Sequence, residues 1–247
     1  MSTFVELAQD MRRGAGLSGT GPTDVATATG IELRLVNYIK NAWISIQNSP
    51  KQWKWMWREY SLASPLTGPL QSIADTTDYL LTDCGKIWTG TFRAYLTATG
   101  TTDRQRMSYI DFEAYQARYA VVNPTSARPL QVTRIPTGGL RLYPPPNDIY
   151  SIEFECQKEP QILVANDDVP EMPSKYHQLI VFEALKAFGK AEDAPEVVKL
   201  AEEEGGSEGG EGRQGTATGM WRQLIWDQEM KRANDPGENP LMVVRAQ

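Results

Sequence analysis

The sequence predicts an α+β protein: a helical bundle formed by N- and C-terminal helices, with an inserted antiparallel β-sheet lobe and an extended C-terminal tail. Apolar residues recur at helical spacing near both ends of the chain, whereas short alternating runs rich in β-branched and aromatic residues fill its middle. The last residues follow an Asn-Asp-Pro-Gly break. We expect residues 1–50 and 173–234 to form the bundle, 51–172 the lobe and 235–247 the tail.

Two helices are predicted at the N-terminal end. Thr3 and Glu6 have the spacing of a capping box and precede an apolar stripe, so a first helix should run from there to the glycines at 14 and 16. Thr29 and Glu32 repeat this spacing before a second stripe. The second helix should end near residue 48, because a proline follows at position 50.

The middle of the chain changes to the period of strands. Residues 91–96, 130–135 and 150–155 alternate and are bounded by turn-forming residues, which predicts antiparallel strands. Gly138-Gly139 indicates a hairpin turn, and one local helix is expected around residues 109–119.

Helical spacing returns near the C-terminal end. Ser174 is a candidate cap for a helix that ends near Gly189, and a shorter helix should cover 195–204. The Gly- and Glu-rich run at 205–212 cannot bury apolar surface and should form a mobile loop. A last helix is expected from about Met220 to Arg232.

Composition excludes several classes of function. The 247 residues carry 25 Lys and Arg against 31 Asp and Glu, a net charge of −6 that argues against a strongly basic nucleic-acid binder. No apolar run approaches the roughly 20 residues of a membrane span, and no secretory signal is apparent, so we expect folding in a cytosol and no membrane partner. Cys84 and Cys156 should be reduced and buried.

Residue types suited to catalysis are scarce, so we expect no enzyme, no cofactor and no metal site. His177, the single histidine, should be a partly exposed polar residue or an interface contact at a helix start. Asp167 and Asp168 are adjacent in sequence, which indicates a loop or turn and not two acids across a cleft.

The segment from Lys51 to Arg58 places three tryptophans among basic and bulky residues. Such a pattern could bind single-stranded nucleic acid or a membrane surface. We favour packing, because a period of two would place Trp53, Trp55 and Trp57 on one face of an extended segment, at the joint between bundle and sheet or at a subunit interface.

The C-terminal tail is a second candidate interface. Leu241, Met242, Val243, Val244 and Arg245 form a short apolar, β-prone segment without a local partner. Such segments commonly add to a sheet edge or groove of another chain, although many chain ends are disordered.

The order of these motifs resembles the head-to-tail adaptor, or connector, proteins of tailed bacteriophages. The similarity begins in the helical segment 30–47 and continues in the tryptophan segment 53–57. It extends through the strand, proline turn and strand at 140–154, and then through a series of single positions: Pro160, Leu163, Asp168, Pro170, Pro173, Tyr176, His177, Ile180 and Ala184. It thus covers roughly residues 4–188.

This resemblance implies a structural virion protein at the head-to-tail junction, assembled in the cytoplasm of the bacterial host. Similar adaptors form a homo-oligomeric ring, usually of twelve copies, that binds the portal ring, lengthens the DNA channel and offers a docking surface for tail or nozzle proteins. Double-stranded DNA would pass through transiently, without sequence-specific binding.

Two alternatives belong to other classes. A nucleic-acid-binding module would use Lys51, Trp53, Lys54, Trp55 and Arg58. A tail-associated glycan hydrolase would use acidic pairs such as Asp167 and Asp168, or Glu153 and Glu155.

Overall fold

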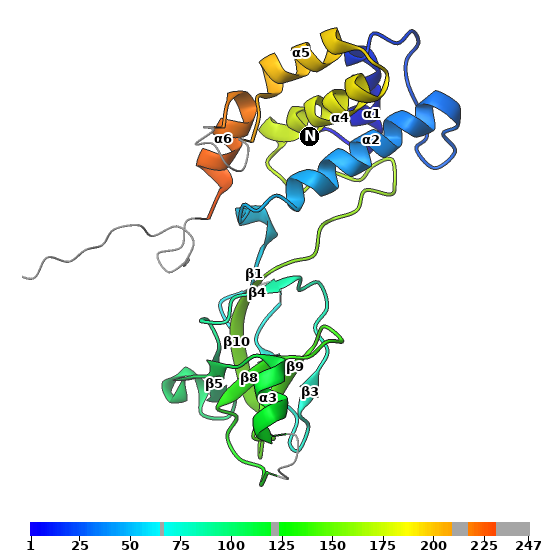
Figure 1. The fold of residues 1–247 in the computed structure, drawn as a ribbon. Coiled ribbons are helices and arrows are strands. Elements are labelled where there is room, and N and C mark those ends of the chain that lie inside the picture. Colours follow the sequence, from blue (N-terminus) through cyan, green and yellow to red (C-terminus); the bar gives the residue numbers. More distant parts are fainter. Residues whose placement is uncertain (65–66, 120–123, 209–216, 231–247) are drawn as a thin grey trace, which may run out of the picture. The chain divides into compact units, whose positions relative to one another are not determined.

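A computed structural model describes residues 1–64, 67–119, 124–208 and 217–230 (Figure 1). The described chain forms two compact units. Met1–Trp55 and the described residues from Pro160 onward make a helical unit, and Met56–Glu159 make a sheet unit. Helices and predominantly antiparallel sheets therefore coexist, and the predicted α+β class is confirmed.

The first two helices follow the sequence pattern closely. Helix α1 spans Phe4–Gly14, and the Thr3 hydroxyl and Glu6 carboxylate form the predicted capping box. Helix α2 spans Gly30–Gln47, but Thr29 makes no side-chain cap bond, so the second predicted capping box is wrong. The carboxylate of Glu32 lies 3.5 Å from the guanidinium of Arg12, so it pairs with α1 instead of its own helix start.

Helix α4, His177–Ala191, packs against α1, α2 and α5 and is the centre of the helical unit (Figure 1). It follows a 3₁₀ turn, Ser174–Tyr176, and extends two residues past Gly189. The prediction that Ser174 caps this helix is wrong, because Ser174 lies inside the 3₁₀ turn. Helix α5 spans Pro195–Gly205, as predicted within one residue.

Helix α6 spans Gly219–Gln228 and ends earlier than predicted. Glu229 is extended and bridges Trp53, and the amide of Met230 donates a 2.7 Å hydrogen bond to the carbonyl of Gln52. Backbone pairing with this distant segment replaces the last helical turn. The helix propensity of residues 229–232 gives no information about a pairing partner so far away in the sequence.

The sheet unit is organised around β10, Tyr150–Gln157. Four strands pair antiparallel with β10, and a fifth, β6, pairs antiparallel with β5. The four are β1 (Trp57–Tyr60), β2 (Leu70–Gln71), β4 (Lys86–Ile87) and β5 (Arg93–Leu96); β6 is Gln105–Arg106. Every residue of β10 from Tyr150 to Phe154 is buried, consistent with a central strand.

A second sheet has the order β3-β9-β8-β7. These strands are Asp78–Tyr79, Leu140–Tyr143, Gln131–Arg134 and Ser108–Tyr109. The β8–β9 hairpin turns at the predicted glycines, and Gly138 has a φ of +92° that favours glycine. Strand β7 pairs parallel with β8, contrary to an entirely antiparallel lobe.

Helix α3 spans Phe112–Tyr119, so it begins three residues later than predicted, because Ser108 and Tyr109 belong to β7. The three predicted strands at 91–96, 130–135 and 150–155 are confirmed as β5, β8 and β10. Side chains from both sheets share one core, which includes Phe92, Val132, Leu140, Leu142, Ile152, Phe154 and the two cysteines.

Candidate interaction surfaces

Four tryptophans of the helical unit pack together. The rings of Trp53 and Trp55 stack with centroids 4.7 Å apart, and Trp43 of α2 lies 6.5 Å from Trp55. Trp221 of α6 lies 6.3 Å from Trp53. Trp53 is fully buried, and its indole N–H donates a 2.8 Å hydrogen bond to the carbonyl of Ile46. This cluster joins α2, the 53–55 segment and α6.

The prediction that three tryptophans share one face of an extended segment is wrong. Lys54–Met56 form a 3₁₀ turn, which has three residues per turn, so the period of two is lost. Trp57 lies on β1 in the sheet unit, is 36% exposed and donates a 3.2 Å hydrogen bond to the carboxylate of Glu155. Of the three tryptophans in this segment, only Trp53 and Trp55 therefore belong to the tryptophan cluster.

The basic residues of this segment are paired. The ammonium of Lys51 lies 3.1 Å from the carboxylate of Glu229, and Lys54 donates to the carbonyl of Asp227. Arg58 lies 3.5 Å from Asp83. Stacking of a nucleobase needs an exposed ring face, and the Trp53 ring is buried between other tryptophans. The arrangement therefore favours packing over nucleic-acid binding.

His177 is buried, so the prediction of a partly exposed side chain is wrong. The backbone amide of Ser2 donates a 3.2 Å hydrogen bond to its Nδ1, and Nε2 lies 3.1 Å from the carbonyl of Met172. This pairing requires the neutral tautomer with the proton on Nε2. Burial lowers the pKa of His177. The N-terminal residues cover the side chain, and the local helix-start pattern gives no sign of them.

Two of the acidic residues proposed for a hydrolase, Asp168 and Glu153, make structural contacts. Asp168 accepts hydrogen bonds from the amides of Val164 and Ala165, at 2.6 and 2.8 Å, and these bonds lower its pKa. The predicted turn at Asp167 and Asp168 is confirmed. Glu153 is buried on β10, with its carboxylate 3.1 Å from the guanidinium of Arg104.

Both cysteines are unpaired and buried in the core of the sheet unit, as predicted. Their thiols share a hydrogen bond, and this contact and burial raise the pKa of Cys156. Across the described ranges, no three His, Cys, Asp or Glu side chains gather where they could hold a metal ion. Among the described helices, none combines the length and the apolar character of a membrane span.

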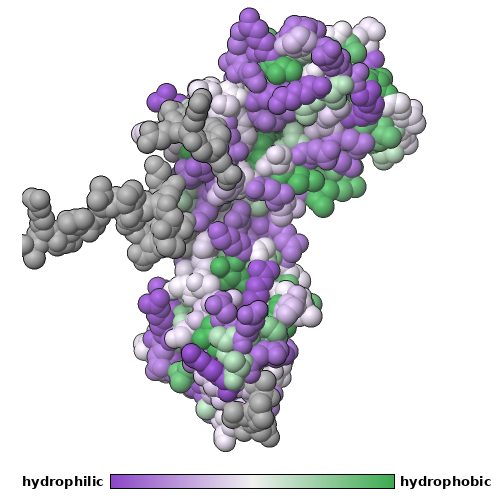
Figure 2. All heavy atoms as spheres, in the orientation of Figure 1, coloured by the Kyte–Doolittle hydropathy of each residue, from purple (hydrophilic) through white to green (hydrophobic). Residues whose placement is uncertain are grey.

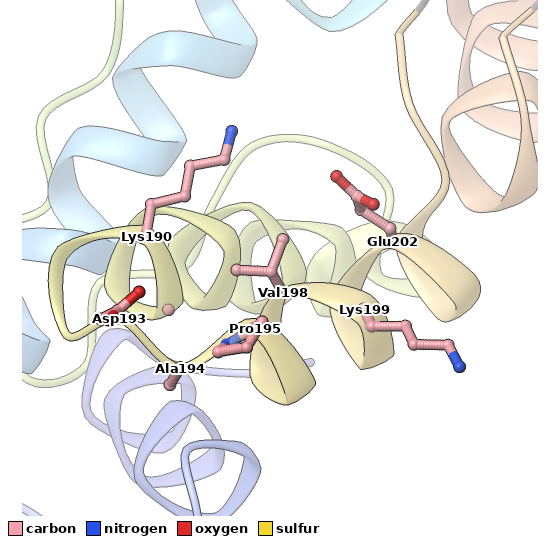
Figure 3. Close-up of a pocket in the computed structure, with 8 residues that line it drawn as sticks. Lys190, Asp193, Ala194, Pro195, Val198, Lys199 and Glu202 are labelled. Atoms are coloured by element: carbon pink, nitrogen blue, oxygen red, sulfur yellow. The ribbon is translucent and has the colours of Figure 1, made fainter.

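A groove of about 300 Å³ lies between the end of α4 and α5, along which it extends to Glu202 (Figure 3). Its lining combines small and apolar residues with four charged side chains: Gly189, Lys190, Asp193, Ala194, Pro195, Val198, Lys199 and Glu202. Gly189 allows the two helices to approach closely, since a Cβ there would lie 2.7 Å from a methyl group of Val198. The groove has an apolar floor and a charged rim, which is the composition of a docking surface.

Exposed apolar side chains occur on both units. Trp226 of α6 is 83% exposed and borders a second, shallow hollow with Gly219, Arg222 and Gln223. The other described apolar residues that are more than 60% accessible are Met1, Leu62, Ile73, Leu80, Ile162 and Val164. On the coloured surface that Figure 2 shows, apolar patches are small and interrupted by hydrophilic side chains.

Sequence reasoning missed the groove and Trp226. The groove arises from the way α4 and α5 pack, which no local pattern encodes. The sequence pattern places Trp226 inside a helix, and its position directly after Leu224-Ile225 could have indicated that it faces away from Trp221 and Leu224. The predicted tail interface, Leu241 to Arg245, and residues 209–212 of the predicted mobile loop lie outside the described residues.

Comparison with protein families relates this chain to one family over most of its length. A family model described as SU10 adaptor protein matches residues 2–228, which is 227 of the 247 residues. No curated protein matches the chain. The match covers far more than half of the sequence and both structural units. The chain therefore belongs to the SU10 adaptor protein family and is a structural component of the bacteriophage virion.

Proposed function

We propose that this member of the adaptor family forms a ring of twelve copies between the portal and the tail. The ring extends the DNA channel and presents a surface on which tail or nozzle proteins dock. The family match over residues 2–228 is the observation that carries this proposal. The exposed apolar side chains on both units also support this proposal, since a ring subunit needs two different side faces and two axial faces for its contacts.

The charge of the chain suits a conduit for DNA. Twelve copies at −6 would total about −72, and a predominantly negative channel would repel phosphates instead of binding them. DNA would then pass without sequence-specific contacts. The burial of Trp53 and the contacts of Lys51 with Glu229 and of Lys54 with the carbonyl of Asp227 support this over the nucleic-acid-binding alternative.

We assign the tail segment Leu241 to Arg245 to docking on the neighbouring portal ring. Deletion of residues 241–247 should leave the circular dichroism spectrum and the unfolding temperature unchanged but weaken binding to the portal, because about five apolar side chains would lose their burial. Unchanged affinity would show that the tail is passive.

Native mass spectrometry of the purified protein, alone and mixed with the portal ring from the same phage, tests the proposal. We expect a complex that carries one adaptor per portal subunit. A monomer that does not bind the portal would contradict the proposal. The measurement on the protein alone also shows whether ring formation requires the portal as a template.

A further inference from the structure

Helix α6 presents a stripe that nothing in the described chain covers. Gly219, Arg222, Gln223 and Trp226 follow the i, i+3, i+4, i+7 spacing of one helix face, which opposes the buried Trp221 and Leu224. Trp226 is 83% exposed. Tryptophan and arginine are the residue types most enriched among the dominant contacts of protein interfaces. We name these four residues the α6 stripe.

The groove between α4 and α5 complements the α6 stripe in chemistry. Pro195 and Val198 offer an apolar floor, and the carboxylates of Asp193 and Glu202 stand at the rim (Figure 3). Two cations also border the groove. Lys199 pairs with Glu203 at 3.7 Å, whereas no ion pair among the described residues uses Lys190, Asp193, Glu202 or Arg222.

The two surfaces lie on different elements: the groove runs from the turn before α5 along that helix to Glu202, and the stripe lies on α6. Helix α6 follows the C-terminal end of α5 (Figure 1). One copy can therefore offer its α6 stripe to one neighbour and its groove to another, which is the head-to-tail arrangement that closes into a ring.

We propose that the α6 stripe of one copy docks into the α4–α5 groove of the next copy. The indole of Trp226 packs on Pro195 and Val198, and the guanidinium of Arg222 faces the carboxylate of Glu202. This inference rests on the proposed ring and names the subunit contact that builds it. It is a contact between different surfaces, so it propagates from copy to copy.

Charge reversal tests the contact in the full-length protein. Arg222→Glu and Glu202→Arg should each weaken self-association by about tenfold or more, measured by sedimentation velocity with the portal present if assembly requires it. The double variant R222E/E202R should recover most of the loss, because the opposite charges then face each other again. Two weakened single variants without recovery in the double variant would overturn the pairing.

Removal of the aromatic anchor provides a second readout. Trp226→Ala should weaken self-association by about tenfold or more, since truncating a buried aromatic anchor is among the largest single losses at an interface. The matched control is Leu200→Ala, an exposed apolar residue of α5 that does not line the groove. Equal and small effects of the two substitutions would overturn the inference.

A mixing experiment distinguishes this contact from a symmetric one. Trp226→Ala lacks the anchor, and Val198→Arg blocks the groove. Each variant alone should remain monomeric, whereas their mixture should form a heterodimer and no ring, because only one groove and one anchor are intact. Circular dichroism confirms that each variant is folded. If the wild type forms rings and each variant alone still forms them too, the inference is overturned and the proposed ring stands. If the wild type forms no ring, the proposed function is overturned as well.

Discussion

At the scale of single residues, tryptophan occupies different environments in the two units. Trp53 is fully buried and bonded through its N–H, whereas Trp57, four positions later, is partly exposed at a sheet edge. His177 illustrates a similar contrast with its sequence context, since the chain start folds over it. Both environments depend on residues far away in the sequence.

Trp53→Ala should destabilise the protein strongly. Loss of a fully buried tryptophan costs about 3–5 kcal/mol of unfolding free energy, and the carbonyl of Ile46 would lose its donor as well. Urea denaturation followed by circular dichroism measures the change. Trp57→Ala is the matched control and should cost less than half as much; equal losses would contradict the assignment of Trp53 to the core.

His177 should make stability depend on pH below neutrality. Its folded pKa lies below the ordinary value of about 6.5, so the unfolded chain binds more protons as the pH falls through that value. The free energy of unfolding should therefore decrease as the pH is lowered from about 7 to about 5. The chain has no other histidine, which makes the effect easy to assign.

The matched variant is His177→Gln, which keeps a polar side chain but does not titrate. Its unfolding free energy should be lower at neutral pH, and its slope between about pH 7 and pH 5 should be flatter than that of the wild type. Chemical denaturation at several pH values gives both slopes. If the variant and the wild type have the same slope, groups other than His177 cause the pH dependence of stability.

At the scale of elements, the sequence predicts long, strongly periodic segments well and long-range pairing poorly. Helices α1, α2 and α5 and strands β5, β8 and β10 lie where their patterns indicate. Strands of two residues, such as β2 and β4, exist only because β10 pairs with them. The end of α6 and the 3₁₀ turn at Lys54–Met56 likewise depend on tertiary partners. The groove is a product of helix packing, so it could not be predicted either.

The junction between α5 and α6 should tolerate no side chain. Gly206 has a φ of +75°, and a Cβ there would lie 1.9 Å from the carbonyl oxygen of Thr218. Gly100 has the same φ with open space around it. Gly100→Ala should cost about 1–2 kcal/mol through backbone strain alone, whereas Gly206→Ala should cost more and release α6.

Limited proteolysis together with thermal unfolding separates the two glycine variants. Gly206→Ala should expose cleavage at Arg222, since α6 would no longer pack beside α5. Gly100→Ala should leave that site protected. If both variants lose the same stability and keep Arg222 protected, the close approach of the two backbones is not what requires glycine at position 206.

At the scale of the whole molecule, the chain leaves the helical unit once and returns once, because the sheet unit is the single continuous segment Met56–Glu159. That segment has a core of its own, formed by side chains of both its sheets. A domain with a continuous chain and its own core can fold without its neighbours. The helical unit, in contrast, is assembled from two separated stretches of sequence.

Residues 56–159 expressed alone should therefore fold. We expect a cooperative thermal transition and dispersed amide signals in a nuclear magnetic resonance spectrum. Phe92→Ala, which removes a fully buried ring from the core of this unit, is the control and should lower the transition temperature of the fragment. A fragment without a cooperative transition would show that the sheet unit depends on the helical unit.

The antiparallel pairing of β1 with β10 has a consequence for protein engineering. Trp57 lies opposite Gln157, so the two ends of the sheet unit stand one strand spacing apart, about 5 Å. A segment whose ends meet so closely can be exchanged for any other module with adjacent termini, such as a fluorescent protein fragment or a peptide tag held in a hairpin. The host helices would need no redesign to accept the new insert.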